Sequence, residues 1–309
     1  MYKTFRRAAP FLLPGLIGLL LFYGIPFVGG IWYSVTDGSL ENRFVGGENY
    51  LSVWKNQMFQ LGLRNTMELS LICAPLLFLL SFVLAAGLHR LRPAGAFFRS
   101  SVLAPYLMPS SAVLIIWLLW FDYGGPVNRM LTALGGQRVD WLLGAELRTP
   151  VVLLFLWKNL GFCVIVFLSA LQAIPDVLYE YATLEGASFP RQTFTITLPL
   201  VVPSAFLVLI LSFVSAFRIF KEVFFIGGAY PEEPLYTLQN YMNNMYGKLN
   251  YQNVTTAAYI FAAIVFVLFG ALFLSQRQAL RRLNGTDEST PRRERKGTRR
   301  ASGRREGKR

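Results

Sequence analysis

The chain has 309 residues, of which 54% are hydrophobic and 15% charged, and its formal net charge is +13. Soluble globular domains contain about 25% charged residues, so this composition excludes an ordinary soluble protein and indicates a membrane protein. One histidine and two cysteines in the whole chain argue against a zinc site or a disulfide framework.

Six apolar runs are long enough to cross a bilayer, which takes about 20 helical residues. Each run must be helical in lipid, because unpaired backbone groups cannot face hydrocarbon. The sequence therefore predicts an all-α fold, a polytopic transmembrane helical bundle of about six spans. The expected spans are Phe11 to Tyr33, Thr66 to Leu88, Ser100 to Phe121, Val151 to Ile174, Leu200 to Phe220 and Thr256 to Ser275.

The first apolar run follows the basic stretch MYKTFRRAAP, as the core of a signal peptide would. Its apolar part continues past about 20 residues, so we interpret it as a retained span. Lys and Arg near the span ends set the orientation of a membrane protein. These cations gather on the side of the two termini, so both termini are expected in the cytoplasm. They are Lys3, Arg6, Arg7, Arg90, Arg92, Arg99, Arg277, Arg281 and Arg282.

Polar residues inside the fourth and fifth spans are candidates for a solute path, because polar groups in membrane helices turn away from lipid. Lys158 in the fourth span has two readings. It faces the interior, or it snorkels outward along Trp157. The candidates for the path are Asn159, Ser212, Ser215 and Arg218.

The polar stretch EYATLEGASFPRQTFTITLP separates the fourth and fifth spans. Pro175 ends the fourth span, and Asp176 is expected to cap a short helix. Gly186 permits a sharp turn, and Ser188 suits the start of a second helix. Two short amphipathic helices are therefore expected to form a compact cytoplasmic knob over residues 175–199. Periodicity alone is equally consistent with a segment that rests in the lipid headgroups.

This loop resembles one in the permease subunits of binding-protein-dependent ABC importers. Their pattern is EAA, three residues, G, nine residues, I, any residue and LP. The chain keeps this spacing, with Tyr181 in place of the middle alanine and Glu185 where Asp is common. The stretches YGGPVNRMLTALGG and FRIFKEVFFIGGAYPEEPLYTLQNYMNN are similar to the carbohydrate-uptake branch, with its permeases for maltose-type sugars and glycerol 3-phosphate. The motif residues are Glu180, Ala182, Gly186, Ile196, Leu198 and Pro199.

The resemblance covers roughly residues 8–278 and implies a permease subunit of a sugar importer in a bacterial inner or plasma membrane. It implies no catalytic site, cofactor or metal in this chain, since ATP and Mg²⁺ would be bound by partner ATPase subunits. A solute-binding protein would deliver the substrate, and a second, related permease would complete the path as a heterodimer. The knob would dock in an ATPase subunit, with Glu180 reaching a basic residue. The sequence itself has no GxxxxGK[ST] phosphate-binding loop.

Two other functions remain open from the sequence. An ion-coupled secondary transporter is expected to hold acidic residues or histidine deep in its spans, and the central thirds of these spans hold no carboxylate. A non-transporting assembly subunit would show no transport defect when the loop is altered. The expected organisation is a cytoplasmic N-terminus (1–10), a permease domain (11–275) and a basic, disordered cytoplasmic tail (276–309). This tail is expected to meet anionic headgroups rather than nucleic acid.

Overall fold

The computed structural model describes residues 2–39, 41–90 and 95–285; the greater part of the predicted tail lies outside these residues. Within them the regular secondary structure is helical, apart from one isolated β-bridge between Thr36 and Phe44. Six helical segments are long and apolar enough to cross a membrane, which confirms the predicted all-α polytopic bundle. These are Pro10–Ser34, Gln57–His89, Ser110–Ala133, Gly144–Gln172, Phe189–Gly227 and Tyr251–Gln278.

Fourteen α-helices are present in the described residues, joined by loops and by short 3-10 and π-helical segments. They are α1 (Tyr2–Leu19), α2 (Ile25–Ser34), α3 (Glu48–Lys55), α4 (Gln57–Arg90), α5 (Gly95–Leu107), α6 (Ser110–Phe121), α7 (Pro126–Ala133), α8 (Arg148–Gln172), α9 (Asp176–Leu184), α10 (Phe189–Gln192), α11 (Leu198–Phe217), α12 (Phe220–Gly227), α13 (Leu238–Gly247) and α14 (Tyr251–Gly285).

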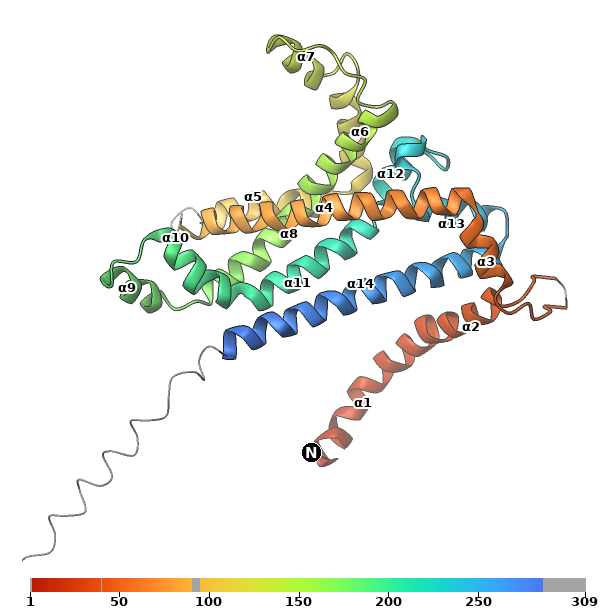
Figure 1. Cartoon of the computed structure of the whole chain (residues 1–309), viewed down its shortest axis with the longest axis horizontal. Coiled ribbons are helices and arrows are strands. Elements are labelled where there is room, and N and C mark those ends of the chain that lie inside the picture. Colours follow the sequence, from red (N-terminus) through yellow and green to blue (C-terminus); the bar gives the residue numbers. More distant parts are fainter. Residues whose placement is uncertain (1, 40, 91–94, 286–309) are drawn as a thin grey trace, which may run out of the picture.

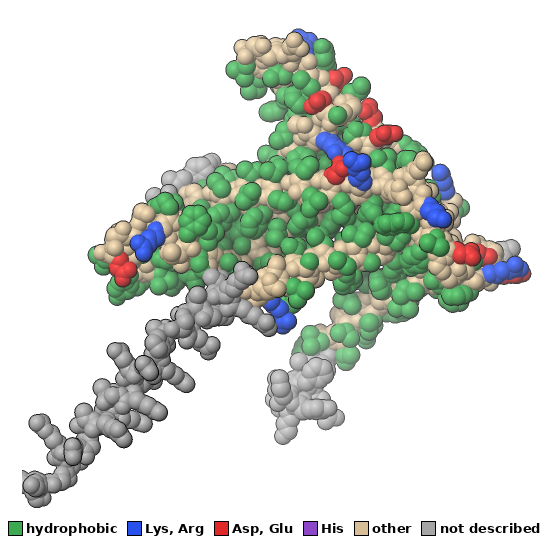
Figure 2. All heavy atoms as spheres, in the orientation of Figure 1, with side chains coloured by type: hydrophobic (Ala, Val, Ile, Leu, Met, Phe, Trp, Pro, Cys, Tyr) green, Lys and Arg blue, Asp and Glu red, His purple; other side chains and the backbone are tan. Residues whose placement is uncertain are grey.

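The centre of the bundle is formed by α4, α8 and α11, with α5 packed along α8 (Figure 1). Their shared interior is apolar. Phe167 on α8 lies fully buried there, with its ring edge-to-face on the rings of Phe78 and Phe82 from α4. The outer surface is apolar as well, and charged side chains gather mainly near the ends of the bundle and around the foot of α6 (Figure 2). This distribution suits helices whose outer faces meet lipid.

The N-terminal span consists of α1, a π-helical turn and α2, and it diverges from the bundle toward its N-terminus (Figure 1). Its principal neighbour is the last helix, α14. The hydroxyl of Thr256 donates to the carbonyl of Ser34 at 3.4 Å, and the hydroxyl of Tyr259 donates to the carbonyl of Phe27. The first and last spans are therefore joined at the end of the bundle away from the two termini.

The third expected span, Ser100 to Phe121, is not one continuous helix, so this prediction was wrong. The structure divides it into α5 and α6, and α6 turns away from the bundle (Figure 1). The break lies at Pro109, whose ψ of 129° is extended. Proline has no backbone N–H to continue the helix, and it disfavours helical geometry at Met108 before it. Hydropathy alone hides this break, because the run stays apolar across it.

A hydrogen-bonded network ties the N-terminal end of α8 to α4 and to the segment before α13. The guanidinium of Arg148 donates to Glu68 Oε2 at 2.8 Å, to Asn65 Oδ1 at 2.7 Å and to the carbonyl of Pro234 at 2.9 Å. The amide of Asn65 donates in turn to the carbonyl of Tyr236 at 3.0 Å. The bonds of Arg148 are charge-assisted. Together with the bond of Asn65 they hold three elements that are distant in sequence at one end of the bundle.

Replacing Tyr241 with phenylalanine is expected to leave the melting temperature unchanged or to raise it slightly. Tyr241 on α13 is fully buried, with its ring edge-to-face on Phe59 at 5.6 Å, and burial raises the pKa of its phenol to about 12. Its hydroxyl has no hydrogen-bond partner among the described residues, and a buried unpaired polar group is destabilising. Tyr241→Ala is the contrasting variant, because a cavity of that size costs about 3 to 5 kcal/mol. Thermal unfolding of the detergent-solubilised protein measures both variants. A melting temperature of Tyr241→Phe well below that of the unsubstituted protein would contradict an unpaired hydroxyl.

Candidate functional site

A polar cavity of about 240 Å³ lies where α6, α8, α11 and α12 meet. Its lining combines hydroxyl, amide and charged groups, which is unusual in the apolar interior of a membrane bundle. The polar and charged residues that line it include Ser110, Lys158, Asn159, Ser215, Arg218, Lys221 and Glu222.

Lys158 and Glu222 are the most enclosed charges of this cavity, with side chains 14% and 12% exposed. Lys158 Nζ lies 3.9 Å from Glu222 Oε1 and also donates to the hydroxyl of Ser110. The break at Pro109 sets this geometry, since it turns α6 across α8 and places Ser110 at the start of the new helix. The reading in which Lys158 snorkels outward along Trp157 is therefore wrong.

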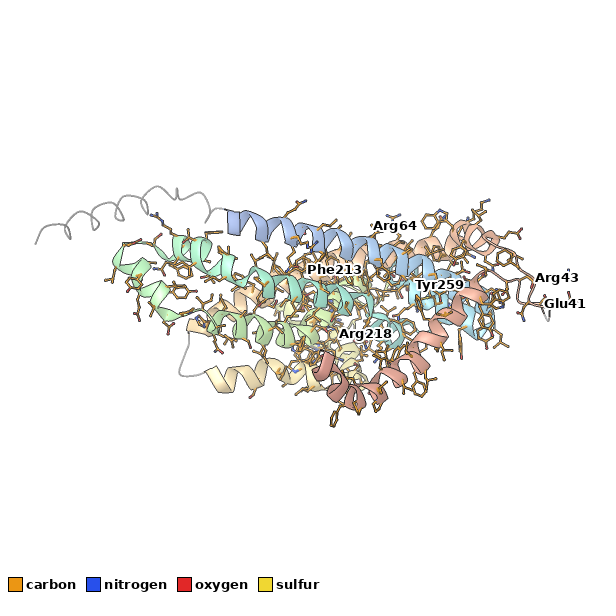
Figure 3. The ribbon with its side chains drawn as sticks, turned by 90° about the horizontal axis from the view of Figure 1, so that it is seen from below. Glu41, Arg43, Arg64, Phe213, Arg218 and Tyr259 are labelled. Atoms are coloured by element: carbon orange, nitrogen blue, oxygen red, sulfur yellow. The ribbon has the colours of Figure 1, made fainter. Side chains whose placement is uncertain are left out.

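Three of the four predicted path residues line this cavity. Asn159 donates its amide to the carbonyl of Phe155 at 2.8 Å, Ser215 is half-buried on α11, and Arg218 follows the last residue of that helix. Figure 3 shows Arg218 at this helix end and Phe213 on the same helix.

Ser212, the fourth predicted path residue, lies outside the lining. It is fully buried one turn before Ser215, where its hydroxyl donates to the carbonyl of Val208 at 2.8 Å and lies 3.9 Å from the sulfur of Cys163. Its hydrogen-bonding need is thus met within its own helix, so it requires no water.

Sequence reasoning did not include Ser110, Lys221 or Glu222 among the path residues. Glu222 and Lys221 follow the fifth apolar run in FRIFKEVFF, where they look like charges that end a span. The turn after α11 brings Glu222 back against the bundle, because α12 packs against α6 and α8, whereas Lys221 beside it stays exposed at the edge of the cavity. The sequence offered two signals for this pair: Lys158 is a single lysine within the fourth apolar run, and Glu222 is a single carboxylate just after the fifth.

The second part of the site is the predicted knob, which lies at the opposite end of α8 and α11 (Figure 1). It consists of α9 and α10, joined at Gly186, whose φ is +76°. The N–H of Gly186 donates to the carbonyl of Thr183 at 3.0 Å, and the N–H of Ala187 donates to that of Ala182 at 2.9 Å. This pair of bonds is the Schellman motif, which ends a helix with a left-handed residue and so favours glycine.

Side-chain contacts fix the two helices of the knob to each other and to the bundle. Gln192 on α10 donates to the Thr183 hydroxyl and to the carbonyl of Ala187, each at 3.0 Å. The hydroxyls of Tyr179 and Thr197 lie 2.9 Å apart, and Ile196 packs against the buried core. The knob is therefore continuous with the start of α11, where Leu198 and Pro199 are half-buried.

The exposed surface of α9 mixes carboxylates with large apolar side chains, and Glu180 lies midway along the helix. Glu180 is exposed on α9, and so are Val177, Tyr181 and Leu184, the last with 85% of its surface free. Ala182, the remaining motif residue, is half-buried. One detail of the prediction was wrong: Pro175, not Asp176, holds the N-cap position of α9. Asp176 is the first residue of the helix, where a negative charge still favours the helix dipole.

The residues described so far thus form a polytopic helical bundle with a polar cavity among its helices and a two-helix knob at one end. The chain matches, over residues 78–283, the family described as the inner membrane component of binding-protein-dependent transport systems. This match covers more than half of the chain, so the chain belongs to that family. It is thus a multi-pass membrane protein, and its family works with a binding protein.

Several relatives of this chain are named as permeases. The trehalose/maltose transport permease MalF of Thermococcus litoralis is 31% identical over 236 residues, covering 74% of this chain and 80% of the relative. The diacetylchitobiose uptake permease NgcF of Streptomyces coelicolor is 28% identical over 301 residues, covering 91% of this chain and 83% of the relative. The sn-glycerol-3-phosphate permease UgpA of Yersinia pestis is 28% identical over 209 residues, covering 66% and 71%.

The fold is also that of a solved transporter. A chain of a bacterial ABC transporter that imports the acidic polysaccharide alginate superposes with a TM-score of 0.75 at 24% identity. The superposition covers 91% of this chain and 98% of that one. At this level of identity the likeness concerns the fold.

Proposed function

We propose that this permease subunit forms the path for a sugar or related solute and couples its passage to ATP hydrolysis by partner ATPase subunits. The relatives named for trehalose and maltose, for diacetylchitobiose and for glycerol 3-phosphate support the substrate class. ATP and Mg²⁺ belong to the partners in this proposal, and the chain contributes no catalytic residue.

The observation that carries the coupling role is the knob. Its two helices are fixed to each other by Gln192 and joined to α11, so a push on α9 is transmitted to a membrane helix. Glu180 is exposed beside the large apolar side chains of Val177, Tyr181 and Leu184, which a partner protein would cover, and the carboxylate could then pair with a cation of that partner. A segment that rests on anionic headgroups would favour cations at this position instead.

The remaining partners follow from the same proposal. The path is completed by a second, related permease as a heterodimer, and a solute-binding protein delivers the substrate from outside. The two termini and the knob over residues 175–199 then lie in the cytoplasm, and the network around Arg148 lies at the outer end. The protein resides in a bacterial inner membrane. The family description, which names both the binding protein and the inner membrane, supports this arrangement.

Single cysteines test the path. We expect cysteine at position 159, 215 or 218 to react with a small hydrophilic thiol reagent, because these residues line the cavity. Cysteine at position 212 is expected to react slowly in this conformation, since Ser212 is fully buried. Labelling of the full-length protein in membranes measures the four rates, with Ile115→Cys on the exposed apolar face of α6 as the lipid-side control. Inertness of all three cavity positions would contradict the path.

Co-purification and vesicle uptake test the function as a whole. The tagged chain is expected to bring down an ATPase subunit and a second permease. The reconstituted complex is expected to take up solute only with ATP and the binding protein. Uptake by this chain alone in an ion gradient would favour the secondary transporter. Normal uptake after changes in the knob would favour an assembly subunit.

A further inference from the structure

We propose that the cavity selects a solute that carries a negative charge, such as a sugar with a carboxylate or a phosphate group. The proposal rests on the path assignment above and adds the charge of the substrate to it. It follows from how the charges around the cavity pair with one another.

The enclosed charges of the cavity neutralise each other. Lys158 and Glu222 are both more than four-fifths buried and lie 3.9 Å apart. An unpaired charge at this depth is costly in a membrane bundle, so the pair is best understood as one neutral unit held by the protein. Lys158 therefore supplies no free positive charge while Glu222 stays ionised beside it.

Two further cations remain after this pairing. Of the described residues that line the cavity, Glu222 is the only carboxylate, whereas Lys158, Arg218 and Lys221 are cations. The cavity thus carries a formal excess of two positive charges. No hydrogen bond or ion pair of the Arg218 side chain occurs within the part of the chain that the structure describes.

The helix dipole of α11 accounts for a cation at position 218, but it does not neutralise the excess positive charge of the cavity. Arg218 follows the last residue of α11, where the helix dipole favours a cation. That interaction places a positive charge at the mouth of the cavity but supplies no anion to complement the guanidinium. A carboxylate or phosphate would complement it with two parallel hydrogen bonds. Ser215 and Asn159 lie on the same lining, where neutral polar groups suit the hydroxyls of a sugar.

The local potential can be measured at one cysteine without knowing the solute. Ser215→Cys in the full-length protein is treated in membranes with two methanethiosulfonates of similar size, one bearing a sulfonate and one a trimethylammonium group. The native Cys73 and Cys163 are buried, with 0% and 3% of their surface exposed. Labelling of the unsubstituted protein measures their background reaction, which is subtracted. The ratio of the two rates, divided by the same ratio for a free thiol, reports the sign of the potential.

We expect the sulfonate reagent to react faster than the trimethylammonium reagent. The ratio of the anionic to the cationic rate should fall when a cation of the cavity is removed and rise when its carboxylate is removed. Arg218→Gln and Lys221→Gln should each lower it by about tenfold, the order of effect of a unit charge near a partly hydrated thiol. Glu222→Gln should raise it. Arg129→Gln is the matched control, since Arg129 lies on α7 at the far end of α6 and should leave the ratio unchanged (Figure 1).

A protection experiment distinguishes the two anionic groups. D-Glucuronate, D-glucose 6-phosphate and D-glucose are compared for their power to slow labelling of cysteine 215 by a neutral thiol reagent. Stronger protection by either acid supports the proposal and identifies its group. Equal protection by glucose, no protection by either acid, or a preference for the cationic reagent would overturn it. These failures leave the coupling role intact, because ATP-dependent uptake and the knob variants are measured separately.

Discussion

Replacing Glu180 with alanine is expected to abolish or strongly reduce ATP-driven uptake while the protein stays in the membrane at normal abundance. Glu180 is exposed, so the folding of this chain loses little, about 0 to 1 kcal/mol at most for an exposed ion pair. In the proposed complex the carboxylate pairs with a basic residue of an ATPase subunit and is partly desolvated, and loss of one partner of such a pair costs about 2 to 5 kcal/mol. Glu180→Asp should be milder, because it keeps the charge.

Uptake into vesicles, measured together with membrane abundance, decides this prediction. Glu146→Ala is the control, since Glu146 is also an exposed carboxylate but lies just before α8, away from the knob. Gly186→Val should lower uptake as well, because a φ of +76° costs a residue with a side chain about 1 to 2 kcal/mol and reorients α10. Normal uptake by Glu180→Ala would contradict the coupling role and favour a knob that only rests in the lipid headgroups.

Replacing Gly161 with alanine is expected to lower the stability of the bundle by about 1 to 3 kcal/mol or more, as overpacking does. At Gly161 on α8 a side chain would overlap the carbonyl of Val102 on α5, with the carbonyl carbon at 2.7 Å and the Cα of Leu103 at 3.0 Å. These are backbone atoms, so no rotamer change relieves the overlap and the two helices must separate. Gly161→Leu should be worse.

The melting temperature of the solubilised protein measures this loss, and membrane abundance shows its effect in the cell. Gly270→Ala on α14 is the control, because a Cβ there meets nothing within 4 Å. That control should be neutral or slightly stabilising, since alanine restricts the unfolded chain. A melting temperature of Gly161→Ala equal to that of Gly270→Ala would show that α5 and α8 are not held in this close contact.

Much of the architecture could be predicted from the sequence because lipid leaves few choices. A long apolar run must become a helix, and the spacing of turn and helix-start residues predicted both helices of the knob with Gly186 between them. Pro109 was visible in the sequence, but the surrounding run gave no reason to break the span there. The pairing of Lys158 with Glu222 was beyond reach, because it depends on how α12 folds back against α8.

The contact between the first and last spans has a consequence for biogenesis. Thr256 and Ser34 are separated by 222 residues, and Tyr259 and Phe27 by 232. A ribosome that adds about 5 to 20 residues per second needs roughly 10 to 45 s to cover that distance. Throughout this interval the first span must persist in the bilayer without its principal neighbour. Its apolar sequence allows this, since none of its most apolar window is buried even in the finished fold. Closure of the bundle is therefore a late step that follows insertion of the last helix.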